Sequence, residues 1–272
     1  MKKTRKLTLL LLTVLSLTLM MGLSASAATR RKLIKTVKEY NAKGKLTYVN
    51  SYKYNSKGDT TSRSWKNYDN GKVVDKGKVT MKRSYYKGTR RVKKITYKNS
   101  GSKYTYSYTY TYNSRGATKT SVYKNSDGGY SKTTYKTSGS RIKSSVTKDK
   151  NGKKTNSAKY DSHGNLKSST YYYDGGKSTT TYKYTYKKGI VRKEVAKYSD
   201  GEVDTWYYNS HGDLTKSVYK YDDNTYTYKY KNKYKGGYMK ERTSYYYNKD
   251  KKKYEKTGKS VYTYTSKTYT LR

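Results

Sequence analysis

The sequence of 272 residues contains no cysteine, no proline and no phenylalanine, and it has only two tryptophans and two histidines. The lack of cysteine excludes disulfides, thiolate metal sites and a lipid-modified cysteine. The lack of proline excludes a proline-containing sorting motif for covalent attachment to a cell wall. Acidic residues are also few, since 18 Asp and Glu stand against 63 Lys and Arg.

The net charge of +45 is extreme for one chain. Such a field attracts polyanions at long range and opposes compaction through self-repulsion, so it predicts a partner of opposite charge. The other interpretation is that lysines alternating along strands only maintain solubility and protect exposed strand edges.

Residues 1–28 have the three parts of a secretory signal peptide: basic residues among the first six, an apolar run from Leu7 to Met21, and the small residues Ala25, Ser26 and Ala27. The run is too short to favour a transmembrane helix, so we expect no stable transmembrane anchor. We predict a protein that is secreted or held noncovalently at the cell surface. The signal peptide and the surface-repeat style favour a Gram-positive bacterium.

The mature chain is rich in turn signals that recur at a fixed interval. The segments Tyr112–Gly116, Tyr160–Gly164 and Tyr208–Gly212 share the pattern Tyr-Asn/Asp-x-x-Gly and lie 48 residues apart. Further Gly, Asn or Asp turn signals divide each interval into pieces of 11 to 14 residues. These features predict one repeat domain over residues 29–272, with residues 112–272 the most regular.

The segments between the turns alternate as strands do. In Tyr104–Tyr112, Tyr occupies one face and Ser or Thr the other. Connections of three or four residues join neighbouring strands as antiparallel hairpins. The fold class predicted is therefore all-β, an antiparallel meander of roughly nineteen or twenty strands of about seven to nine residues.

Forty tyrosines replace the usual aliphatic core. Because a buried tyrosine hydroxyl needs a partner or water, this composition favours a thin layer over a thick sandwich. Open sheets of many strands rarely stay flat. We therefore expect an elongated sheet that is strongly twisted or coiled on itself.

Part of the chain resembles the YD repeats of RHS-type surface and toxin-shell proteins. The resemblance lies in Tyr160–Leu166, Tyr173-Asp174-Gly175 and Lys188–Val191. It covers residues 112–224 best and implies a strip of β-hairpins that spirals into a shell. The chain is too short for a closed shell of that family and has neither its Pro-rich core motif nor a C-terminal toxin domain.

A shorter segment, Trp206–Leu214, is similar to one hairpin of the choline- or glucan-binding repeats of secreted Gram-positive proteins. That resemblance implies ligand binding between the aromatic side chains of successive hairpins. Because the only tryptophans are Trp65 and Trp206, tyrosine rings would have to supply most of the stacking surfaces. Tyr184, Trp206 and Tyr228 are the aromatic candidates.

No catalytic constellation is evident. His163 and His211 occupy the same turn position in two successive repeats, so they are expected to point outward in parallel without converging partners. Most carboxylates lie in turns, and the glutamates, including Glu194, show no pairing typical of a glycosidase. We predict no enzymatic activity, no cofactor and no metal site.

We expect a non-enzymatic protein that binds an anionic cell-wall polymer or an acidic polysaccharide through distributed Lys and Arg, with extracellular DNA as a further partner. The candidate basic residues are Lys183, Lys187, Lys188 and Lys193, interleaved with tyrosines. The alternatives are a structural or adhesive surface strip and an aromatic carbohydrate-binding module. The sequence does not fix the oligomeric state.

Overall fold

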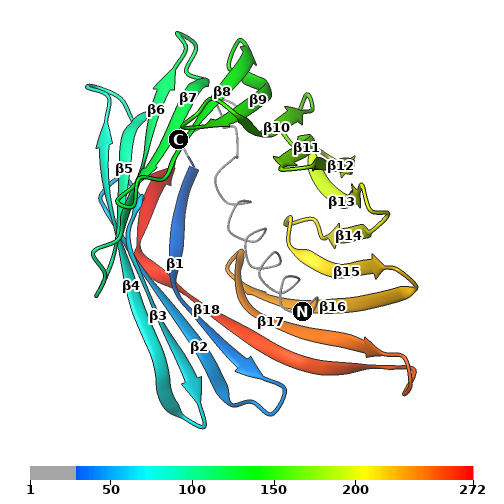
Figure 1. The fold of residues 1–272 in the computed structure, drawn as a ribbon. Helices are drawn as coiled ribbons and strands as arrows, with labels where there is room; N and C mark the ends of the chain where they lie inside the picture. Colours follow the sequence, from blue (N-terminus) through cyan, green and yellow to red (C-terminus); the bar gives the residue numbers. More distant parts are fainter. Residues whose placement is uncertain (1–28, 272) are drawn as a thin grey trace.

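The computed structural model describes residues 29–271, and within this range the chain forms eighteen β-strands (Figure 1). The predicted signal peptide lies outside the described residues. The strands are β1 (Thr29–Asn41), β2 (Leu46–Tyr54), β3 (Thr60–Asp69), β4 (Lys72–Tyr85), β5 (Val92–Asn99), β6 (Thr105–Tyr112), β7 (Thr118–Asn125), β8 (Tyr130–Ser138), β9 (Arg141–Asp149), β10 (Lys154–Tyr160), β11 (Leu166–Tyr173), β12 (Gly176–Lys187), β13 (Ile190–Tyr198), β14 (Val203–Tyr208), β15 (Leu214–Tyr221), β16 (Asn224–Lys235), β17 (Tyr238–Asn248) and β18 (Lys253–Leu271).

The strands form a single antiparallel meander that closes into a barrel. Each strand pairs with the next in sequence, and β1 pairs with β18 in a register that sets Val37 opposite Tyr262. Figure 1 shows these first and last strands side by side. The predicted all-β meander is confirmed, but the predicted open, elongated or coiled sheet is wrong. The accumulated twist of eighteen strands brings the two edges together, and their pairing satisfies backbone groups that an open sheet leaves exposed.

The strands are fewer and less uniform than predicted, from six residues in β14 to nineteen in β18. Long strands arise where the chain lacks a turn signal, as in β18 after Lys253. Register shifts accompany most of the pairings, including a shift between Lys32 and Thr36 in β1. Such bulges bend strands and increase their twist, which suits a closed wall.

The glycines of the repeated turn have the predicted backbone conformation. Gly116, Gly164 and Gly212 have φ values of 86°, 86° and 79°, which side chains with a Cβ rarely adopt. In the middle turn, Asp161 Oδ1 accepts hydrogen bonds from the backbone N–H groups of His163 and Asn165 at 2.9 and 2.8 Å. Asn or Asp therefore closes the turn with its own side chain.

A second contact joins the last two of these turns to the next turn on the same rim, and we call it the tyrosine clasp. Tyr186, at the end of β12, donates its hydroxyl hydrogen to Asp161 Oδ2 at 2.9 Å, and Asn165 Nδ2 donates to the Tyr186 oxygen. The following repeat has the same arrangement, with Tyr234 Oη 2.7 Å from Asp213 Oδ2. The 48-residue interval is thus four strands. In the first of the three turns, Asn113 donates to Thr137 and Gly139 in place of a tyrosine.

The barrel wall has few buried aliphatic side chains. The buried hydrophobic residues in the described range are Ile95, Ala117, Ala158 and Ala196. In the register, Ile95 lies opposite Tyr108 and Ala196 lies opposite Tyr182. The wall is therefore a thin layer of aromatic rings over one sheet.

Candidate functional site

The two faces of the barrel wall differ in chemistry. Cross-strand partners share a face, so the register places Asn50, Trp65 and Gly77 on one side of β2–β4 and Ser51, Ser64 and Lys78 on the other. The same alternation continues through every strand pair and meets itself at β1 and β18. We call the side of Trp65 the tyrosine face and the side of Lys78 the lysine face.

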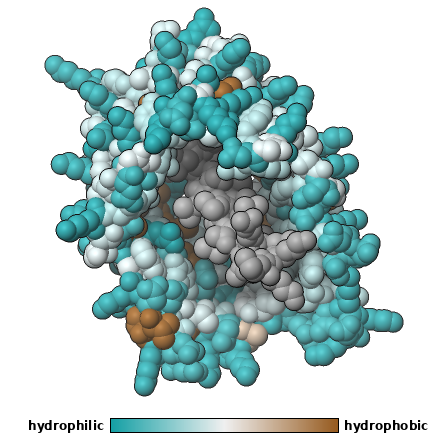
Figure 2. Space-filling model, in the orientation of Figure 1, coloured by the Kyte–Doolittle hydropathy of each residue, from teal (hydrophilic) through white to brown (hydrophobic). Residues whose placement is uncertain are grey.

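The lysine face is the outer surface of the barrel. Figure 2 shows hydrophilic side chains projecting outward around the wall. On most strands an exposed lysine alternates with a half-buried residue of the tyrosine face, as in the run from Thr181 to Lys187 of β12. Exposed lysines of the lysine face include Lys38, Lys66, Lys78, Lys98, Lys124, Lys136, Lys159, Lys183, Lys197, Lys220 and Lys231.

The tyrosine face lines the inside of the wall and holds itself together by ring contacts. Tyr97 stacks on Tyr106 with ring centroids 4.5 Å apart and planes within 6°, and Tyr108 contacts Tyr123 at 5.3 Å. Burial, reinforced by the neighbouring phenols, raises the pKa of Tyr106 to about 12. These ring contacts join neighbouring strands of the sheet.

The structure separates the predicted site residues onto the two faces. Lys183 lies in β12 and Lys193 in β13, both on the lysine face, while Lys187 and Lys188 lie at the connecting turn. Lys183, Lys187 and Lys188 are exposed, and Lys193 Nζ lies 5.6 Å from the centre of the Tyr207 ring.

The three predicted aromatic residues all lie on the tyrosine face. The Tyr184 hydroxyl donates to Leu166 O at 3.0 Å, and burial raises the pKa of this phenol. Trp206 packs edge-on against Tyr219 at 6.2 Å. Tyr228 contacts Tyr246 at 5.3 Å. These side chains are therefore not combined with the four predicted lysines into one site.

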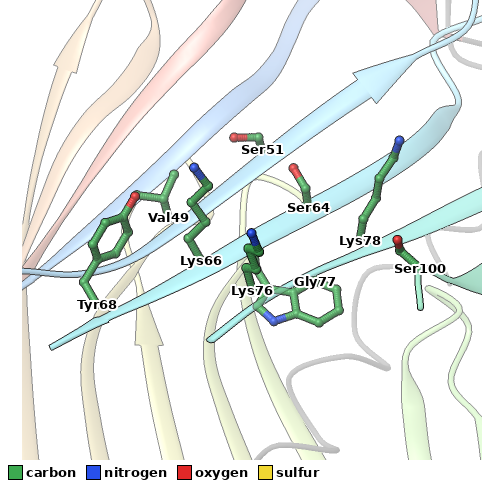
Figure 3. Close-up of a pocket in the computed structure, with 10 residues that line it drawn as sticks. Val49, Ser51, Ser64, Lys66, Tyr68, Lys76, Gly77, Lys78 and Ser100 are labelled. Carbon is green, nitrogen blue, oxygen red and sulfur yellow. The ribbon is translucent and has the colours of Figure 1, made fainter. Parts of the chain in front are cut away.

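A shallow hollow of about 440 Å³ lies on the lysine face over β2–β4 (Figure 3). Lys66, Lys76 and Lys78 line it together with Ser51 and Ser64, and the opposite wall of the barrel lies behind it in the view. The hydroxyl and ammonium groups are suited to the oxygens of an anion. Sequence reasoning missed this hollow, because it depends on the register of three strands.

On the tyrosine face of the same strands, one position of β4 has no side chain. Trp65 lies across Gly77, its cross-strand partner, and a Cβ at that position would overlap the indole ring. Lys66 and Lys76, on the other face, are also direct cross-strand partners. Two ammonium groups are thus held side by side at the edge of the hollow.

Lysine ammonium groups also lie over tyrosine rings of the lysine face. Lys193 and Lys216 flank Tyr207 at 5.6 and 5.5 Å from its centre. Lys229 lies 4.1 Å from the centre of the Tyr254 ring. The sequence suggested tyrosines as open stacking surfaces, whereas on this face lysines cover several of them. Cation–π contacts hold these lysines in place while their charge stays at the surface.

Two carboxylates are buried on the tyrosine face. Tyr208 donates to Glu194 Oε2 at 3.0 Å, and Tyr198 donates to Asp204 Oδ2 at 2.9 Å. Burial raises the pKa of both carboxyl groups, and the tyrosine hydrogen bonds only partly offset this effect. Both carboxylates accept hydrogen bonds from phenol hydroxyls. Sequence reasoning missed this role.

The two histidines occupy equivalent exposed turns, as predicted, but each has a partner. His163 stacks on Tyr186 with centroids 4.2 Å apart, and His211 stacks on Tyr234 at 4.5 Å. Each ring therefore covers the tyrosine of a clasp. Within residues 29–271 no group of three or more His, Asp or Glu side chains is arranged to hold a metal ion.

Comparison with known proteins identifies a similar fold but no family. No protein-family model and no curated protein matches the sequence. A porin-like protein from Bacteroides uniformis is similar in structure, with a TM-score of 0.50 and 12% identity over 85% of this chain and 96% of that one. At this identity the similarity shows the barrel fold alone. The resemblance to YD repeats stays a prediction.

A more distant match is the Tc holotoxin pore of Photorhabdus luminescens, with a TM-score of 0.33 and 12% identity over 81% of this chain and 13% of that one. It is too dissimilar to support an argument. In the described part of the chain, no helix is long and apolar enough to span a membrane.

Proposed function

We propose that this chain is a non-enzymatic protein that binds anionic polymers through the lysine face of its barrel. The observation that carries the proposal is the segregation of charge, because exposed lysines occupy the outer surface of most strands while the tyrosine face lies inside the wall. A convex cationic surface attracts polyanions from every side. The expected partners are an anionic cell-wall polymer or an acidic polysaccharide.

The charge of the lysine face argues against a lipid-embedded barrel, even though a structural neighbour is porin-like. Barrels that span an outer membrane carry an outward apolar band, and one Lys at the bilayer midplane costs about 2–4 kcal/mol. Here exposed lysines recur on the outer side of strands all round the wall. We infer that the outer surface faces water and soluble or wall-bound anions, in keeping with the secretion predicted from residues 1–28.

The closed wall bears on both alternatives. In a barrel closed by β1 and β18 there is no free strand edge among the described strands, which removes the simplest mode of adhesive assembly. The aromatic residues proposed for carbohydrate binding lie on the tyrosine face and contact one another. Neither alternative gains support from these positions.

The test is the salt dependence of binding to a purified anionic wall polymer. Affinity should fall steeply between about 50 and 200 mM salt, because counterion release dominates such binding. Replacing Lys183, Lys187, Lys188 and Lys193 together by Gln should weaken binding in a graded manner. The same four positions changed to Arg provide the control, and this variant should bind as the wild type does.

Two tyrosine variants separate the electrostatic mechanism from aromatic recognition. Tyr184→Ala and Tyr228→Ala should reduce stability and leave the polymer affinity of the folded fraction unchanged, because both rings pack within the sheet. Salt-insensitive binding that either substitution abolishes in a folded protein would refute the proposal and favour the carbohydrate-binding alternative.

A further inference from the structure

Three lysines of the lysine face stand in a row across adjacent strands. Lys148 of β9 is the direct partner of Lys132 in β8 and of Lys154 in β10. Directly opposed residues have Cβ atoms about 4.5–5.5 Å apart, so the three Cβ atoms lie within about 10 Å of wall. All three side chains are exposed. We call them the lysine row.

The lysine row carries an electrostatic cost. Like charges directly opposite each other destabilise a sheet. Within residues 29–271 none of the three lysines forms an ion pair with a carboxylate, whereas the nearby Lys153 is paired with Asp174. An anion bound across the row would relieve this repulsion.

Hydroxyl groups complete one end of the row. Lys154 Nζ donates to the Tyr172 hydroxyl at 2.7 Å, and Ser157 Oγ lies 3.2 Å from the same oxygen. Whichever of Tyr172 and Ser157 donates in that second contact, the other keeps a free O–H. The hydrogen bond from Lys154 also lowers the pKa of Tyr172, as expected where positive potential is concentrated. Lys177, the cross-strand partner of Tyr172, adds a further cation.

We propose that the lysine row, with Tyr172 and Ser157, is a binding site for consecutive phosphate groups of a linear polyol-phosphate chain. This inference rests on the proposed function and assigns it a place and a ligand class. Lysine binds phosphate as a point charge, and tyrosine and serine hydroxyls donate to phosphate oxygens. The row supplies both kinds of donor on a convex wall where a flexible chain can lie across the strands.

A chain without bases fits the row better than single-stranded DNA does. Base recognition by such surfaces needs open aromatic faces on which bases stack. Here Lys154 Nζ lies 4.3 Å from the centre of the Tyr172 ring and covers one side of it. The geometry therefore provides phosphate contacts without a stacking platform.

The experiment compares two triple variants of the same charge. In the first, Lys132, Lys148 and Lys154 are changed to Gln. In the second, Lys98, Lys197 and Lys220 are changed to Gln, since these exposed lysines face uncharged cross-strand partners such as Thr105, Val203 and Thr225. Melting temperature is measured without ligand, and affinity for poly(glycerol phosphate) is measured from 50 to 200 mM salt.

The first variant should melt at a higher temperature than the wild type, because the like-charge repulsion is gone, and yet bind at least tenfold more weakly at 50 mM salt. Its slope of log affinity against log salt should fall by about 2, near the value for three lost phosphate contacts. The control variant should show no rise in melting temperature and a smaller loss of affinity.

Equal losses in the two variants would overturn the lysine row as a site while leaving distributed polyanion binding intact. Wild-type binding that does not respond to salt would refute the proposed function itself. Single-stranded DNA with the same number of phosphates serves as the competing probe. Binding of DNA without binding of poly(glycerol phosphate) would overturn the ligand class.

Discussion

The hydroxyl of Tyr186 donates to Asp161 Oδ2 at 2.9 Å across 25 positions of sequence. It also accepts a hydrogen bond from Asn165, so one phenol joins two neighbouring turns of the same rim. Tyr234 repeats the arrangement with Asp213 and Asn209. In the first part of the chain, Tyr85 contacts Asp59 and Asn55 in the same way. The clasp is thus a recurring device of the barrel.

Removal of one clasp hydroxyl should destabilise the barrel. Tyr186→Phe leaves the Asp161 carboxylate and the Asn165 amide without this partner, so the free energy of unfolding should fall by about 1–2 kcal/mol. Urea unfolding followed by tyrosine fluorescence measures the change. Tyr226→Phe is the matched control, because that exposed phenol makes no hydrogen bond within residues 29–271. Equal effects of the two substitutions would show that the clasp adds nothing.

Replacing the repeated glycine Gly164 by a residue with a side chain should strain the backbone of the turn. Gly164 has a φ of 86° and open space around its Cα, so Gly164→Val should cost about 1 kcal/mol or more through conformation alone. Ser162→Ala in the same turn should have little effect. Chemical denaturation of both variants tests this, and equal tolerance would contradict the structural role of the 48-residue register.

The close approach of Trp65 to Gly77 predicts a coupled pair. Gly77→Ala should destabilise the protein by about 1–3 kcal/mol, because the added methyl group overlaps the indole. Trp65→Leu removes the obstacle, so the double variant should be more stable than the sum of the single losses predicts. A double-mutant cycle of unfolding free energies measures this coupling. Additive losses would mean that the indole does not rest on Gly77.

The pH dependence of stability should reveal the buried Glu194. Burial raises its pKa above the ordinary 4.5, so the folded state binds this proton more tightly than the unfolded state does. The stabilisation is complete below about pH 4 and is lost as the pH rises through the raised folded pKa. Glu194→Gln does not titrate, so its stability relative to the wild type should increase between pH 4 and pH 7.

Glu241 supplies a control with the opposite sign. Lys233 lowers the pKa of this carboxyl group, so its stabilising effect is present above the unfolded pKa and is lost as the pH falls. Glu241→Gln should therefore lose stability relative to the wild type on going from pH 4 to pH 7. Unfolding curves at both pH values distinguish the two carboxylates. Parallel trends would contradict the assigned environments.

The sequence was sufficient to predict features that depend on residues near one another in the chain. The alternation from Tyr104 to Tyr112 predicted β6 and its tyrosine face, and Gly116, Gly164 and Gly212 predicted the turns with positive φ. Short connections predicted antiparallel pairing of successive strands. Each of these features depends on the backbone preferences of residues that are close together in the sequence, so the residue pattern predicts it.

Features that depend on register or on distant strands were not predicted. Lys148 pairs with Lys132, and its pairing with Lys154 depends on a register shift between Lys154 and Asn156 that no residue pattern predicts. The pairing of β1 with β18 depends on the sum of small twists over the whole sheet. The candidate aromatics lie in β12, β14 and β16, and the register puts all three on the face opposite Lys183 and Lys193.

The pairing of β1 with β18 also sets the order of folding. Val37 and Tyr262 are partners across almost the full length of the domain, so closing this seam has the largest loop-closure entropy cost, and we expect it to form last. Until β18 has been synthesised and has paired, β1 presents an unpaired edge that other nascent chains can extend. We expect refolding to be slow and concentration-sensitive, with chains truncated before Lys253 aggregating rather than forming smaller barrels.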